Sequence, residues 1–351
     1  MKKKLLKKKV DLKIMLSNVR GFNSKKDVID KIIDVVKPSV ICLNETGLRG
    51  KSKINIKGYS SFTKNRQQKS MGGVSTSVED SLRASTVKVK ESLEEDDEYI
   101  ITRLDHCIPP LNIINIYGQQ ESRAGKEAIL GSWYRLMNDL EGIQSKGEGC
   151  LLLGDMNRKI GNDWLGVMGN KPEISKGGEL IRDLLESKEY VLINNTELAE
   201  GGPFTREDPG NADNKSCLDL CIVSVNILPY VKRMFIDSGK MFTPYRITKK
   251  NGALAKVYTD HYTEIIELVG MPSKFLYKSP DTKWNLMRPG GWDNYERITD
   301  DYAESIGDMV KDKELHINEV VRRLDKYQEK IKYAAFGKTK EKGRKRVGGR
   351  Y

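Results

Sequence analysis

The hydrophobic pattern of the chain consists of short apolar runs that end in polar residues. The clearest run is LLLGDMN at 151–157, in which three leucines precede Gly154 and Asp155. This pattern predicts a buried strand that stops abruptly. If strand geometry continues through Met156, Asp155 and Asn157 point to the same side. An aspartate in this position is also typical of a turn or a helix N-cap, so the motif alone leaves both interpretations open.

Other apolar segments place polar side chains in the same way. These segments and their polar residues are 12–18 with Asn18, 40–45 with Glu45, 111–117 with Tyr117, 216–224 with Asp219, and 257–269 with Asp260 and His261. Strand ends expose reactive groups on a rigid support, so these positions are candidate site residues.

The remaining pattern mixes helices with short strands. Helical spacing of apolar residues covers 25–36, 125–146 and 179–187, and short strands are predicted at 59–63, 74–78, 86–90, 99–104 and 190–195. The segments 161–178 and 203–213 are predicted loops. No fixed-period repeat is visible, which argues against a solenoid.

The composition shifts after Gly270, and this shift predicts the domain organisation. Prolines and glycines mark a linker, and a long helical pattern follows over 292–336. We therefore expect a basic tail at 1–9, one domain at 10–270, a linker with a helical appendage at 271–336, and a second basic tail at 337–351.

The net charge of +12 belongs to the two ends of the chain. Residues 1–9 carry six lysines and no acid, and residues 338–351 carry seven Lys or Arg against one Glu, which leaves the body neutral. Clustered cations at chain ends suit salt-sensitive contact with nucleic acid or a nuclear-import signal. They are also compatible with tails that serve only solubility.

Two features predict the compartment. No apolar run approaches the ~20 residues of a membrane span, and the N-terminus lacks the apolar region of a signal peptide. The five cysteines are odd in number and have no CxxC spacing, so we expect buried free thiols. These observations favour an intracellular protein with no membrane partner.

The polar strand ends predict a chemistry. Carboxylate and amide oxygens are the hard ligands that Mg²⁺ prefers, together with substrate phosphate oxygens. His261 and Tyr117 add groups for proton transfer and phosphate stabilisation. The set therefore indicates metal-assisted hydrolysis of a phosphate ester.

Seven short motifs occur in an order that resembles a known superfamily. They are NVRG at 18–21, LNET at 43–46, NIYG at 115–118, GDMN at 154–157, PFT at 203–205, SCLD at 216–219 and TDH at 259–261. Their order over residues 10–270 resembles the endonuclease/exonuclease/phosphatase superfamily. Within it, the chain looks most like the apurinic-endonuclease-like domain of non-LTR (LINE-type) retrotransposons. The resemblance implies an α+β fold, a four-layer αββα sandwich with its site where strand ends converge.

The resemblance also implies residue roles. Glu45, with Asn18 and Asp260, would hold Mg²⁺, for which Mn²⁺ could substitute. Asp155 would activate or align the attacking water, and Asn157 would orient it. His261, oriented by Asp219, would contact the phosphate. Tyr117 would donate to a phosphate oxygen, and Thr205 and Ser216 would line the site.

Two departures refine the resemblance. Arg20 stands where the repair enzymes of the superfamily carry an acidic residue, which favours the retrotransposon interpretation. The chain contains no YxDD-type polymerase motif, although such elements continue into a reverse transcriptase.

The expected function is Mg²⁺-dependent nicking of DNA that leaves a 3′-hydroxyl for target-primed reverse transcription. DNA is the expected partner, and element RNA could bind the basic tails, with the oligomeric state left open. The alternatives are a phosphatase or phosphodiesterase acting on inositol phosphates or lipids, and a non-catalytic nucleic-acid-binding remnant. The segment SCLDLCIVS lacks the tryptophan-bearing motif of inositol phosphatases, which counts against the first alternative.

Overall fold

The computed structural model describes residues 8–66, 72–82, 84–86, 99–118, 126–161, 174–250 and 253–274. The predicted helical appendage at 292–336 and most of both basic tails lie outside these residues. Their boundaries therefore remain predictions.

Seven of the described strands form the first sheet. Their order is β10 (Ala199–Glu200), β14 (Val231–Ile236), β17 (Glu264–Ser273), β1 (Lys8–Asn18), β2 (Val40–Asn44), β4 (Val74–Glu79) and β3 (Tyr59–Lys64). β1 and β2 run parallel, with Asn18 opposite Asn44 at their ends. This pairing places the polar ends of both strands at one edge of the sheet.

Six described strands form the second sheet, in the order β5 (Ala84–Thr86), β6 (Tyr99–Leu104), β7 (Leu111–Tyr117), β8 (Gly149–Asp155), β13 (Asp219–Ser224) and β9 (Tyr190–Leu192). β7 and β8 are parallel and end together at Tyr117 and Asp155. β13 is antiparallel to β8 and begins at Asp219, opposite Asp155. Three polar residues therefore lie at one edge of this sheet.

Apolar side chains fill the space between the two sheets. Leu16 and Ile266 from the first sheet and Leu153 and Cys221 from the second are fully buried members of this core. Alternate residues of the same strands face outward, as the period of two along a strand requires. Each sheet therefore has one face in this core and one face turned outward.

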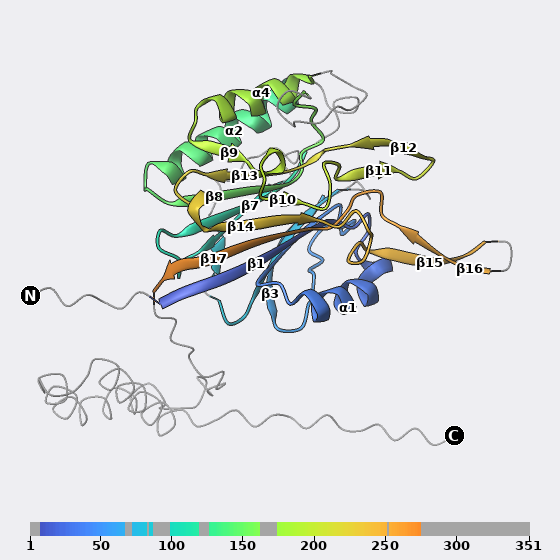
Figure 1. Ribbon diagram of the computed structural model, residues 1–351. Coiled ribbons are helices and arrows are strands. Elements are labelled where there is room, and N and C mark those ends of the chain that lie inside the picture. The colour runs from blue at the N-terminus through green and yellow to red at the C-terminus, as the bar shows by residue number, and fades with distance from the viewer. Residues whose placement is uncertain are drawn as a thin grey trace, which may run out of the picture. The chain divides into compact units, whose positions relative to one another are not determined.

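Helices cover the outer faces. α1 (Lys26–Val36) packs on the first sheet through residues such as Ile29 and Ile33. α2 (Lys126–Gln144) and α4 (Lys176–Glu186) lie side by side on the second sheet (Figure 1). None of these described helices combines the length and apolar character needed to span a bilayer.

The layers are thus helix, sheet, sheet and helix, which confirms the predicted αββα sandwich. Short 3₁₀ turns complete the described elements: η1 (Asn23–Lys25), η2 (Ile193–Asn195) and η3 (Leu228–Tyr230). All five cysteines are buried free thiols, as the sequence predicts.

Some predicted elements have different limits in the structure. α4 begins at Lys176 and not at Glu179, because Ser175 caps it by accepting a hydrogen bond from the Gly178 N–H. The predicted polar loop at 203–213 forms much of a hairpin of β11 (Arg206–Asp208) and β12 (Asn211–Ser216).

The segment predicted as one strand over 257–269 is divided. Its first two residues belong to a second hairpin, β15 (Tyr245–Lys250) and β16 (Ala253–Tyr258), and β17 starts only at Glu264. The residues between them, including Asp260 and His261, lie outside strands, apart from an isolated bridge between His261 and Arg206.

Candidate active site

The strand ends of the two sheets meet through one asparagine. Asn18 Nδ2 donates to Glu45 Oε1 and to Asp155 Oδ2, both at 3.0 Å. Asn18 is fully buried, and Glu45 and Asp155 are 8% and 1% exposed. The amide therefore ties a carboxylate of the first sheet to a carboxylate of the second, and it brings together three of the predicted site residues.

A second asparagine, Asn44, holds the backbone of Asp155. Asn44 Oδ1 accepts a hydrogen bond of 3.0 Å from the Asp155 N–H, and Asn44 Nδ2 donates to Asn115 Oδ1 at 2.8 Å. Both asparagines are completely buried between the sheets. The sequence prediction missed these supporting residues, although amides inside apolar strands signal a buried hydrogen-bond network.

His261 completes the cluster. Its Nδ1 lies 2.7 Å from Asp219 Oδ2, and its Nε2 lies 3.6 Å from Asp155 Oδ2. Burial disfavours the charged ring, but the carboxylates of Asp219 and Asp155 outweigh it and raise the pKa of His261 to about 10. The ring is therefore an imidazolium at neutral pH.

Asp155 is a buried carboxylate whose two oxygens have different neighbours. Burial, together with the negative charges of Asp219 and Glu45, raises its pKa, while His261 opposes the shift. The Asn157 N–H donates to Asp155 Oδ1 at 3.1 Å. Asp155 thus has one oxygen held by backbone and one oxygen shared between Asn18 and the imidazolium.

Asn157 does not extend the strand, so the strand geometry on which its expected orientation beside Asp155 depended does not continue through Met156. β8 ends at Asp155, and Asn157 has a φ of 49°. Asparagine tolerates this left-handed conformation because its short polar side chain can bond locally. Its Nδ2 donates to the Gly118 carbonyl at 2.8 Å, beside Tyr117 at the end of β7.

Glu45 has the features of a cation ligand. It follows β2 in a left-handed conformation with a φ of 49°, and its buried Oε2 has no hydrogen-bond partner among the described residues. A buried carboxylate oxygen without a partner is costly unless a cation or water satisfies it. Glu45 therefore fits a Mg²⁺ site, whereas Asn18 turns its Nδ2 toward Glu45 and its Oδ1 accepts the Arg20 N–H at 3.2 Å.

Asp155, Asp219 and His261 also lie close enough together to suggest a metal site. The Nδ1 atom of His261 is already engaged by Asp219 at 2.7 Å, and its Nε2 atom faces Asp155 at 3.6 Å. The buried Oε2 of Glu45 has no hydrogen-bond partner among the described residues, so the geometry favours Glu45 as the ligand.

Asp260 lies next to His261 but has other partners. Its Oδ1 is 3.0 Å from an Arg20 guanidinium nitrogen, and its Oδ2 is 3.3 Å from Arg206 Nε. Both carboxylate oxygens of Asp260, which was predicted to help hold a metal, are thus in ion pairs with arginines. Sequence reasoning noticed Arg20 but not Arg206.

Thr205 and Ser216, which were predicted to line the site, differ in their contacts. Thr205 is fully buried, and its Oγ1 accepts the N–H groups of Leu218 and Asp219, both at 3.0 Å. It therefore fixes the start of β13. Ser216 pairs with Arg206, and its buried hydroxyl has no partner among the described residues. The structure does not bring Ser216 into the hydrogen-bonded cluster.

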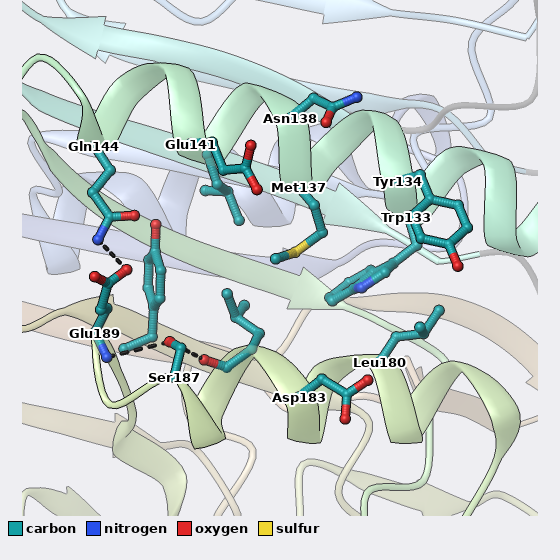
Figure 2. A pocket seen from close by; sticks show the side chains of 13 residues that line it. Trp133, Tyr134, Met137, Asn138, Glu141, Gln144, Leu180, Asp183, Ser187 and Glu189 are labelled. Atoms are coloured by element: carbon teal, nitrogen blue, oxygen red, sulfur yellow. Dashed lines mark hydrogen bonds between the residues drawn. The ribbon is translucent and has the colours of Figure 1, made fainter.

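A groove of about 400 Å³ lies elsewhere, between α2 and α4 (Figure 2). Trp133, Met137 and Leu180 supply its apolar lining, and acidic side chains such as Asp183 and Glu141 border it. Its 13 lining residues include no Lys or Arg. Its charge does not suit a phosphate-bearing ligand.

The sequence matches a family model over residues 15–261, described as the Endonuclease/Exonuclease/phosphatase family. The chain belongs to this family. No curated protein sequence matches the chain at a significant level.

Solved structures share the fold at low sequence identity. AP endonuclease LMAP from Leishmania major superposes with a TM-score of 0.56 and 16% identity, covering 74% of this chain and 88% of that one. The 3′ phosphatase NExo from Neisseria, bound to product DNA hairpin, gives 0.53 and 14%, covering 73% and 99%. The endonuclease domain of TRAS1, a telomere-specific non-LTR retrotransposon, gives 0.49 and 13%, covering 74% and 98%, which is too weak to support an argument.

Proposed function

We propose that this family member is a metal-dependent DNA endonuclease that hydrolyses one phosphodiester bond and leaves a 3′-hydroxyl. The observation that carries the proposal is the buried chain from Glu45 through Asn18 and Asp155 to His261 and Asp219. It combines a ligand oxygen, a carboxylate and an imidazolium at one edge of the sandwich. The DNA hairpin bound to NExo, which has the same fold, supports DNA as the substrate class.

Each residue has a role that its contacts support. Mg²⁺ held by Glu45, which Asn18 orients through a hydrogen bond, would supply charge stabilisation at a phosphate oxygen. Asp155, fixed by Asn44 and Asn18, holds and orients the attacking water. The His261 imidazolium, positioned by Asp219, stabilises the charge that develops on the phosphate.

Tyr117 and Asn157 belong to the neighbouring strand ends. Tyr117 is opposite Asp155 in the register of β7 and β8, and its hydroxyl donates to a phosphate oxygen. Asn157, anchored on the Gly118 carbonyl, orients the water and the scissile phosphate.

The test is relaxation of supercoiled plasmid in the presence of Mg²⁺. The parent chain nicks the plasmid, and Asp155→Asn lowers the rate on the order of 10²-fold or more. Asp183→Asn, which removes an exposed carboxylate on α4, serves as the matched control and keeps the parent rate. A parent chain that fails to nick any DNA contradicts the proposal, and phosphate release from an inositol polyphosphate would favour the phosphatase alternative.

We also propose a retrotransposon origin, which rests on the motif resemblance and on Arg20. The nick then supplies the primer for reverse transcription, the basic ends bind element RNA, and the protein acts in the nucleus. Extension of the nicked strand by a DNA polymerase tests the 3′-hydroxyl. Loss of RNA binding and of nuclear accumulation on removal of residues 1–7 and 338–351 tests the role of the tails. A nick that cannot be extended, or tails whose removal changes neither property, contradicts the respective role.

A further inference from the structure

Asp260 is held between two arginines at the rim of the cluster. Its side chain is 8% exposed, whereas those of Arg20 and Arg206 are 44% and 27% exposed. Arg206 Nε donates a hydrogen bond to Oδ2, and Arg20 makes an ion pair with Oδ1 without hydrogen-bond alignment. The carboxylate is thus buried, while both arginine side chains are partly exposed.

Together, Arg20 and Arg206 carry one more positive charge than the carboxylate of Asp260 neutralises. One carboxylate neutralises one of the two guanidinium groups, and neither group has another ion-pair partner among the described residues. A guanidinium has five N–H donors, of which Asp260 engages a minority in each case. The remaining donors suit a phosphate, which arginine binds in a bidentate manner.

Backbone contacts connect each arginine to the reaction centre. The Arg20 N–H donates to Asn18 Oδ1 at 3.2 Å, so Arg20 is fixed beside the predicted metal ligands. Arg206 forms a backbone bridge with His261. The two arginines are therefore held by different residues of the site, Asn18 and His261, and both lie within the described residues.

Two more cationic side chains, those of Lys25 and Arg246, lie near Arg20. Lys25 Nζ donates to the Arg20 carbonyl at 2.8 Å. Burial, followed by the charges of Arg246 on β15 and of Arg20, lowers the pKa of Lys25. The carboxylates of Glu45 and Asp260 oppose this shift, so Lys25 and Arg246 add positive charge next to Arg20 in a region that also holds carboxylates.

We propose that Arg20 and Arg206 form a binding pair for a DNA phosphate beside the scissile bond, and that Asp260 positions the pair and does not bind the metal. The proposal rests on the proposed function for its substrate class. In this arrangement Asp260 acts as a positioning residue: it aligns the two guanidinium groups before DNA arrives, which reduces the entropy lost on binding.

The first test measures binding without cleavage. A short labelled DNA duplex is titrated in EDTA with Asp155→Asn protein, alone and combined with Arg20→Gln or Arg206→Gln, at several salt concentrations. Each arginine substitution weakens binding about 10-fold and lowers the slope of log affinity against log salt by about 1, as expected for one lost phosphate contact.

Arg103→Gln is the matched control. Arg103 also contacts two carboxylates, Asp105 and Glu148, but Glu148 precedes β8 and so lies at the opposite end of that strand from Asp155. Its substitution leaves affinity and salt slope unchanged. Unchanged affinity and slope in both the Arg20 and Arg206 variants overturn the proposal, as does a parent chain that binds no duplex. Arg→Lys variants that retain the salt slope but not the full affinity show that charge and planar geometry both contribute.

The second test concerns Asp260 and needs no DNA. Mg²⁺ raises the melting temperature of the parent chain; Asp260→Asn keeps the parent's response, whereas Glu45→Gln needs a higher Mg²⁺ concentration for the same stabilisation. An Asp260→Asn protein that loses the Mg²⁺ response overturns the positioning role. Because both tests omit cleavage, a chain that binds DNA through the arginines but never nicks plasmid contradicts the proposed function and leaves the phosphate-binding pair intact.

Discussion

The Nδ1 atom of His261 lies 2.7 Å from Asp219 Oδ2, and both side chains are at least 95% buried. Their residues come from different segments, the start of β13 and the turn that precedes β17. Thr205 Oγ1 accepts the Asp219 N–H at 3.0 Å, which holds the backbone that carries this carboxylate. The contact therefore defines which ring nitrogen faces Asp155.

Asp219→Asn is expected to remove this control of His261. Burial lowers the pKa of the His261 ring and the Asp219 carboxylate raises it, so removing this negative charge makes the pKa fall from about 10. The nicking rate then falls on the order of 10²-fold or more. The chain has three histidines, so ring resonances can be followed by NMR titration and assigned with His261→Asn. An unchanged His261 titration in Asp219→Asn would contradict the role given to Asp219.

The local sequence pattern was sufficient to predict which polar residues lie at the ends of strands. Asn18, Glu45 and Asp155 each follow an apolar run, and the structure joins all three in one hydrogen-bonded group. The pairing that brings them together is not local, because it depends on which strands become parallel neighbours. The family resemblance supplied that information as the αββα fold, and it also supplied the predicted link between His261 and Asp219.

Other features had no local signal. The β15 and β16 hairpin was missed because residues such as Arg246, Ile247 and Val257 are exposed, so no alternating apolar face exists. The contact of Arg206 with Asp260 was missed because it joins distant segments. Glu264 looks like an outward residue of an alternating strand, yet its register with Leu16 places it in the buried layer.

Glu264 is expected to destabilise the fold as pH rises. It is fully buried, and neither carboxyl oxygen has a partner among the described residues. Burial, then the charges of Asp219 and Asp155, raises its pKa well above the usual value. The folded state therefore keeps a proton that the unfolded chain releases above about pH 4.3, so the free energy of unfolding decreases above that pH.

Glu264→Met should accordingly raise the free energy of unfolding, by about 1–3 kcal/mol from removing an unsatisfied polar group and by more as pH rises. Urea unfolding of both proteins at pH 4.5 and pH 8 measures this difference. Glu264→Gln, which cannot ionise, isolates the pH-dependent part. A stability gain that is equal at the two pH values would show that Glu264 does not hold a raised pKa.

Glu45→Gln is expected to weaken Mg²⁺ binding about 10-fold or more, because a neutral amide replaces the carboxylate whose Oε2 lacks a partner among the described residues. The Mg²⁺ concentration that gives half of the maximal thermal stabilisation measures the effect without DNA. Glu186→Gln removes an exposed carboxylate of α4 and is the control. Equal Mg²⁺ responses in parent and Glu45→Gln proteins would place the cation elsewhere.

Gly154 allows Asp155 to leave β8 at the correct position. Its φ is 143°, and a Cβ atom there would lie 1.9 Å from the Ile116 carbonyl oxygen on β7. Gly154→Ala is expected to lower the free energy of unfolding by at least about 2 kcal/mol and to displace Asp155, since the strands must separate. Gly142 in α2 has open space around its Cβ position, so Gly142→Ala should instead stabilise the protein by about 1 kcal/mol. Urea unfolding distinguishes the two, and equal effects at both glycines would mean that the close approach of β7 and β8 does not constrain the reaction centre.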